Sequence, residues 1–82
     1  MIKYNPRLRV RKESFGYIMG VPGSIIVVKE EGKKLLDEID LKSVEYVIEK
    51  LSKECKESKE EIADKVTQLI SVLLKREIFV DE

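Results

Sequence analysis

The 82-residue sequence contains no histidine, no tryptophan and a single cysteine, Cys55. Without histidine or a second thiol, zinc-finger clusters, Ser-His and Cys-His catalysis and histidine-ligated metal sites are excluded. One cysteine cannot form an internal disulfide, so a cytoplasmic location is the expectation. The sequence also has no glycine-rich phosphate-binding loop. These absences predict a protein that is not an enzyme and has no metal site and no cofactor.

Long hydrophobic segments are also missing. No apolar run approaches the roughly 20 residues of a membrane-spanning helix. Arg7, Arg9 and Arg11 interrupt any signal-peptide core near the N-terminus. With 43% apolar and 39% charged residues, the composition is typical of a folded protein. The length predicts a single small domain over residues 1–82 that does not bind a membrane.

The net charge is zero, but the charges are unevenly distributed. Residues 1–29 carry six basic residues and one acidic residue, and residues 30–82 carry ten basic and fifteen acidic residues. The simpler interpretation is a solvated strand face beside solvated helices, and the alternative is a basic patch that receives an acidic partner. Asp37 and Asp40 lie at a helical spacing, which indicates a solvated face rather than an acid–base pair.

The first part of the chain predicts three short strands. Residues 8–13 alternate between apolar and charged side chains, as in a half-buried strand. A second strand is expected over residues 15–19, after a tight turn at residues 13–14. Residues 20–23 form the next turn, in which Gly23 is free to take a positive φ. The third strand follows this turn.

The third strand, Ser24–Val28, is the most informative segment of the sequence. It reads Ser-Ile-Ile-Val-Val and carries neither the charges nor the proline that normally protect a sheet edge. An uncovered edge of this kind can accept an extended peptide by strand addition. Only the odd-numbered or the even-numbered pair of its apolar residues can face the core, and the sequence leaves both choices open. The opposite face is expected to be covered by another part of the structure.

Three helices are predicted to follow. The first is expected over residues 30–39, and the second begins after Ser43 as its N-cap. Cys55 continues the apolar periodicity of the second helix and is therefore interpreted as a small core residue. The third helix opens with a capping box at Ser58 and runs to about residue 76. The apolar residues 78–80 are predicted to fold back and close the core.

The third helix has an apolar arc wider than the stripe of about 100° that one core contact needs. Leu69 and Leu73 lie in the middle of this arc and are expected in the core. Ile70, Val72 and Leu74 lie at its edges, where at least one is expected to be partly exposed. The arc indicates either a deeply buried helix or a helix that serves the core on one side and a ligand groove on the other.

Several segments carry a resemblance to a known family: Asn5-Pro6-Arg7, Val10-Arg11-Lys12-Glu13-Ser14-Phe15-Gly16, Val28-Lys29-Glu30-Glu31-Gly32, and the closing pattern of Val66, Leu69, Leu73 and Lys75-Arg76-Glu77-Ile78. With this order of strands and helices, the chain resembles the PqqD-like family, the recognition elements of ribosomally synthesised and modified peptides. It looks most like the peptide chaperones of mycofactocin-type systems. Lys29 stands where the family often has asparagine, and Glu77 where it often has glycine.

The resemblance implies an α+β fold, a winged helix-turn-helix variant with a three-stranded antiparallel sheet followed by three helices. It also implies a peptide chaperone that is not an enzyme. The leader of a precursor peptide would add as a strand to the third strand and pack on the third helix, and a radical SAM maturase would be the partner enzyme. The candidate peptide contacts are Ser24, Ile25, Ile26, Val27, Val28, Lys65, Leu69, Ile70 and Val72.

Two other functions fit the pattern. A winged-helix DNA-binding protein is the main alternative, because Arg7, Arg9 and Arg11 could meet phosphate. The mixed charge of the third helix, its apolar middle and a pI near 6.4 argue against nucleic acid as a partner. The other alternative is a structural module that forms a homodimer through the exposed sheet edge.

Overall fold

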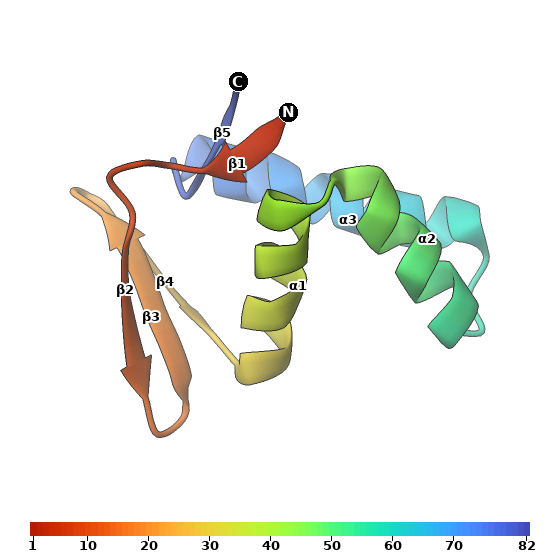
Figure 1. Cartoon of the computed structure of the whole chain (residues 1–82), viewed down its shortest axis with the longest axis horizontal. Coiled ribbons are helices and arrows are strands. Elements are labelled where there is room, and N and C mark those ends of the chain that lie inside the picture. The colour runs from red at the N-terminus through yellow and green to blue at the C-terminus, as the bar shows by residue number, and fades with distance from the viewer.

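The computed structural model describes all residues from 1 to 82. It contains five strands and three helices, in the order β1 (Ile2–Tyr4), β2 (Arg9–Glu13), β3 (Gly16–Val21), β4 (Ser24–Val28), α1 (Glu30–Leu41), α2 (Val44–Glu54), α3 (Lys59–Lys75) and β5 (Phe79–Asp81). The antiparallel sheet β2-β3-β4 stands at one end of the molecule, α1 lies beside it, and α2 lies toward the opposite end (Figure 1). The predicted α+β class, with three antiparallel strands followed by three helices, is confirmed.

The hairpin between β2 and β3 lies one residue later than predicted. Glu13 pairs with Gly16, so the turn residues are Ser14 and Phe15, and Phe15 is exposed rather than part of a strand. Gly16 explains the shift, because its φ of 142° is one that only glycine adopts readily. A Cβ at this position would also overlap the carbonyl oxygen of Val28.

The hairpin between β3 and β4 agrees with the sequence prediction. Val21 pairs with Ser24, which leaves Pro22 and Gly23 as the two turn residues. Gly23 has a φ of 87°, the positive value expected for glycine in this turn. The turn therefore sets the register of β4, and the register decides which groups of β4 remain free.

Both predicted N-cap serines cap their helices, but the second bond of the capping box, from the Ser58 amide to the Glu61 side chain, is absent. The Ser43 hydroxyl accepts a hydrogen bond from the Tyr46 amide at 3.0 Å, and the Ser58 hydroxyl accepts one from the Glu61 amide at 3.2 Å. Each bond satisfies an amide that would otherwise be unpaired at a helix start. The placement of Cys55 in the core is wrong, because α2 ends at Glu54 and the thiol is exposed.

The C-terminus of α3 turns sharply into β5. The Ile78 amide bonds to the Leu73 carbonyl at 3.0 Å, and the Glu77 amide bonds to the Leu74 carbonyl at 3.1 Å. Together these bonds form a Schellman motif, in which Glu77 takes the left-handed φ of 63° that glycine usually supplies. Ile78 and Phe79 are consequently buried, so the prediction that this tail closes the core is confirmed.

The pairing of the two chain ends has no counterpart in the sequence prediction. β1 pairs antiparallel with β5, and both termini lie side by side in Figure 1. Tyr4 stacks on Phe79 with 5.1 Å between ring centroids. The Tyr4 amide donates to an Asp40 carboxylate oxygen at 2.8 Å, and the Tyr4 hydroxyl donates to Asp37, also at 2.8 Å. These two aspartates are therefore structural partners of β1 rather than merely a solvated face.

Burial of the Tyr4 ring, together with its hydrogen bond to Asp37 and the nearby negative charges, raises the pKa of Tyr4 well above its ordinary value. The hydroxyl therefore remains a proton donor throughout the neutral range. The bond fixes the N-terminal strand to α1. The core lies between this strand pair, the sheet and the helices; its largest fully buried side chains are Phe79, Met19, Ile39, Ile78 and Val47.

Candidate functional site

The outer edge of β4 has no strand partner. In the sheet order β2-β3-β4, β4 is bonded to β3 on one side only. In a two-residue hairpin the pair beside the turn, here Val21 and Ser24, exchanges both backbone hydrogen bonds, and bonded and non-bonded pairs then alternate. The backbone N–H and C=O groups of Ile25 and Val27 therefore point away from β3, toward the free edge.

The side chains of β4 divide between two environments. Ile26 and Val28 face the interior and pack against the core. Ile25 and Val27 face outward and are 66% and 62% exposed. The choice left open by the sequence is thus resolved, and the expected cover over the second face of the strand is absent.

A groove runs beside the free edge of β4, between this strand and α3. It has a volume of about 260 Å³, and its lining comes from three elements: Ile26, Val27 and Val28 of β4, Gly32 and Leu36 of α1, and Leu69, Val72, Leu73 and Arg76 at the end of α3. Seven of these nine residues are apolar, and none is acidic. The groove can therefore hold apolar side chains of a ligand while the edge of β4 supplies backbone hydrogen bonds.

The third helix contributes to the groove through one flank rather than through its centre. Val72 is 49% exposed and Leu69 is 37% exposed, so the placement of Leu69 in the core is wrong. Leu73 is buried, as predicted, and Ile70 is buried at 7% exposure. The expectation of at least one exposed residue at the arc's edge is met by Val72.

Four candidate peptide contacts do not line the groove: Ser24 and Ile25, which lie at the start of β4, and Lys65 and Ile70 of α3. Ile70 belongs to the core, and Lys65 does not line the groove. The Lys65 ammonium is 2.6 Å from a carboxylate oxygen of Glu57 in the loop before α3, and this hydrogen bond raises the pKa of Lys65. Lys65 does share the helical flank of Leu69 and Val72, by the i, i+4, i+7 spacing, but lies one turn too early.

Four residues that line the groove were not among the candidate contacts: Gly32, Leu36, Leu73 and Arg76. Gly32 is tolerated inside α1 although glycine weakens a helix by up to about 1 kcal/mol relative to alanine. A Cβ there would lie 3.7 Å from the Cβ of Val28, so the missing side chain opens space beside β4. Arg76 follows Leu69 and Val72 at the same helical spacing, a signal that was present in the sequence.

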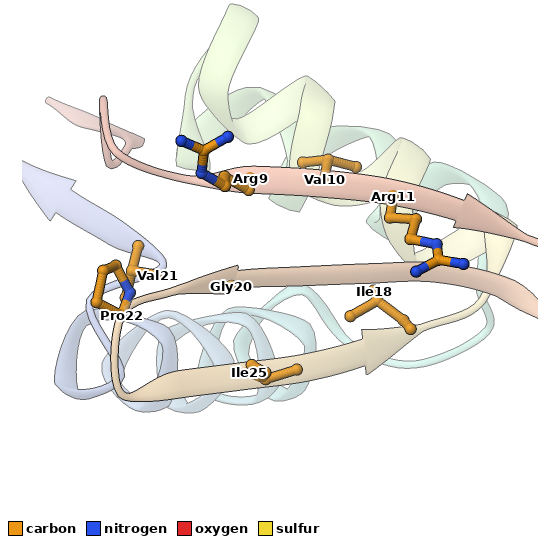
Figure 2. A pocket seen from close by; sticks show the side chains of 8 residues that line it. All are labelled: Arg9, Val10, Arg11, Ile18, Gly20, Val21, Pro22 and Ile25. Atoms are coloured by element: carbon orange, nitrogen blue, oxygen red, sulfur yellow. The ribbon is translucent and has the colours of Figure 1, made fainter.

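A second hollow lies on the outer face of the sheet, on the side opposite the groove. Its volume is about 480 Å³, and Figure 2 shows its lining on three neighbouring strands, including Arg11 of β2, Ile18 of β3 and Ile25 of β4. Gly20 lies among them and has no side chain to fill the space. This hollow is larger in volume than the groove, and the central strand beneath it, β3, is bonded on both sides.

Both regions combine apolar side chains with guanidinium groups. The groove offers apolar contact, free amide and carbonyl groups and one guanidinium, while the outer hollow offers apolar contact and the guanidinium groups of Arg9 and Arg11. No helix of the structure has the length and apolar character to span a membrane. Comparisons of the chain with protein-family models, curated proteins and solved structures gave no match.

Proposed function

We propose that this protein binds an extended peptide as a fourth strand along the free edge of β4. The observation that carries the proposal is the coincidence of two features at one place: an uncharged, unpaired strand edge and an apolar groove directly beside it. Either feature alone would be weak support. Together they offer a peptide both its backbone hydrogen bonds and a place for its side chains.

The register of β4 defines how such a peptide binds. Its backbone bonds to the outward N–H and C=O groups of Ile25 and Val27, each bond contributing about 0.5–1.5 kcal/mol net. Its side chains alternate, so every second residue enters the groove against Leu69 and Val72. The residues between them lie on the outer face, next to the exposed side chains of Ile25 and Val27.

We further propose that the peptide is the leader segment of a ribosomally made precursor, held for a modifying enzyme. The resemblance of the sequence to the PqqD-like family supports this choice of ligand and implies a radical SAM enzyme as the partner. The geometry fits this role, since the bound leader would lie along one edge of the protein. The rest of the precursor would then remain free to enter another active site.

The test uses a display library of random peptides about twelve residues long, selected against the intact protein. Amide hydrogen exchange by NMR is then measured with and without the strongest binder. The amides of Ile25 and Val27 point to solvent in the free protein, so they are expected to exchange rapidly and to become protected in the complex. Those of Ile26 and Val28 are bonded to β3 and should be protected in both states.

The outward amides of Val10 and Lys12, on the opposite edge of the sheet, provide the internal control, because they should remain unprotected. Failure to select any peptide that protects Ile25 and Val27 would overturn the proposal. Changes confined to residues 7–11 would indicate a charge contact instead, as for nucleic acid. Protection of the β4 amides that rises with protein concentration in the absence of peptide would indicate pairing between two copies.

A further inference from the structure

One cation lies at the wall of an otherwise apolar groove. Arg76 lines the groove beside Leu69 and Val72, and its guanidinium forms no ion pair. The contrast with Lys65 on the same flank is informative, because Lys65 is paired with Glu57. Arg76 is therefore the one charged group that the groove presents to a ligand, and no carboxylate of the groove neutralises it.

The fold does not depend on the side chain of Arg76. It is the C-cap of α3, and its backbone amide bonds to the Val72 carbonyl at 3.0 Å. Its side chain makes no hydrogen bond within the protein, and the residue is exposed. The helix and the turn into β5 are held by backbone groups, so the guanidinium is free to serve a ligand.

Resting on the proposed function, we infer that Arg76 selects peptides that carry an aspartate or glutamate on the face that enters the groove. A guanidinium binds a carboxylate through two parallel hydrogen bonds, which gives geometric selectivity as well as attraction. Because side chains on one face of a strand recur every second residue, the acidic residue lies two positions from an apolar one. The ligand class is thus an acidic–apolar strand with the spacing acid-x-apolar or apolar-x-acid.

The experiment is a charge exchange between protein and peptide. The first member of the peptide pair is the strongest binder from the random library, and the second is the same peptide with its groove-facing acidic residue replaced by lysine. Affinities are measured for the wild-type protein, Arg76→Glu and Lys75→Glu. Lys75→Glu is the matched control, since Lys75 is exposed in the same turn of α3 but does not line the groove.

The wild-type protein is expected to bind the acidic peptide about tenfold more tightly than the lysine peptide, which corresponds to about 1.4 kcal/mol. Arg76→Glu should reverse this preference, whereas Lys75→Glu should retain it. Both variants place the same charge near the C-terminus of α3, so effects of the helix dipole and of net charge are shared. A thermal melt of each variant checks that the fold is kept, and Arg76→Gln should abolish the preference without reversing it.

The inference is wrong if the two glutamate variants shift the preference equally, because net charge would then explain it. It is also wrong if the selected peptides show no acidic residue two positions from an apolar one. Neither result would affect the proposed function as long as Ile25 and Val27 amides are protected in the complex. Loss of that protection would overturn the proposed function instead, whatever the peptides' charge.

Discussion

The sheet has two free edges, and they differ in the charge of their side chains and in what lies beside them. The β2 edge has the sequence Arg-Val-Arg-Lys-Glu, with four charged residues of five, while the β4 edge has Ser-Ile-Ile-Val-Val, with none. Charged side chains make an edge unfavourable for another strand, because pairing would bring charges together and desolvate them. The chain therefore protects one edge of its sheet and leaves the other open.

The surroundings of the two edges reinforce this difference. A groove with apolar walls lies beside the free edge of β4, whereas β2 lines only the hollow on the outer face of the sheet, and four of its five residues are exposed. An added strand at β2 would gain backbone hydrogen bonds, but it would have to pair beside four charged side chains. The fold thus protects only one edge of its sheet with charges. The edge that it leaves open, β4, is the one beside α3, where the side chains of a ligand can be held.

The largest expected effect is on the free energy of unfolding, and it compares a charge placed in the core with the same charge placed in the groove. Ile70→Asp would bury an unpaired carboxylate in the core, which costs several kcal/mol and should unfold a domain of this size. Val72→Asp places the same charge at a half-exposed groove position, so the free energy of unfolding should change by only about 0.5 kcal/mol. Peptide binding should nevertheless be strongly weakened. A thermal melt and a binding isotherm for each variant measure the two effects.

If Val72→Asp also unfolds the protein, this flank of α3 is part of the core, and the groove is not a surface available to a ligand. Unchanged peptide affinity in a folded Val72→Asp protein would remove α3 from the binding site. Leu74→Asp serves as a further reference, because Leu74 is partly buried against the core but does not line the groove.

The second prediction compares the two edges directly by proline substitution. Val27→Pro removes an outward N–H at the β4 edge, and Val10→Pro removes the equivalent outward N–H at the β2 edge. Both prolines keep the bonds to β3 and impose a similar φ restriction on an edge strand. Val27→Pro is expected to lower peptide affinity at least about tenfold, through a lost bond and the bulk of the ring, whereas Val10→Pro leaves it unchanged.

Isothermal titration with the library-selected peptide measures both affinities, and circular dichroism checks that both proteins fold. Equal losses of affinity would mean that proline at either edge disturbs the whole sheet. The peptide site could then no longer be assigned to the β4 edge. A larger loss for Val10→Pro would move the site to the β2 edge.

The sequence predicted the strand of this site, the turn before it and the helix caps, but it did not predict which side of α3 faces the core. Caps and turns are local chemistry, which is why Ser43, Ser58 and Gly23 were identified correctly. Leu69 was assigned to the core because the apolar arc of α3 is so wide that its centre does not reveal which side faces the protein. That side is decided by the packing of α2 and β5 against α3, which brings Ile70 and Leu73 inward.

The other differences have similar causes. The β1–β5 pairing joins residues 75 to 79 positions apart, and a three-residue strand has too few residues to show a period. The turn at Ser14 and Phe15 was shifted because the glycine that decides it follows the turn rather than lying inside it. The groove itself depends on Gly32 and Leu36 of α1, whose closeness to β4 is a property of the tertiary fold.

A third, smaller effect concerns self-association. The double variant Arg11→Val and Lys12→Val removes two charges from the β2 edge, so that both edges of the sheet become open to pairing. We expect the weight-average mass to rise with protein concentration more steeply than in the wild-type protein. Val27→Lys, which adds a charge at the β4 edge, should have the opposite effect. Sedimentation velocity over a concentration series measures both, and identical behaviour of all three proteins would show that edge charge does not control pairing here.

The smallest expected effect is on DNA binding. The two edges should differ in how strongly salt weakens the binding of their ligands, DNA at the β2 side and peptide at the β4 edge. Arg7, Arg9 and Arg11 can approach phosphates from the β2 side, so weak binding to duplex DNA without sequence preference is expected at low salt, and it should vanish at physiological salt because it depends on counterion release. Binding of the selected peptide should change far less over the same range, since apolar contacts and backbone hydrogen bonds supply most of its affinity. Fluorescence anisotropy with labelled DNA and labelled peptide measures both curves. The three arginines, Arg7 in the turn before β2 and Arg9 and Arg11 on β2, provide charge but no set of base contacts. Sequence-selective DNA binding that persists at physiological salt would therefore contradict the assignment and favour a winged-helix DNA-binding function.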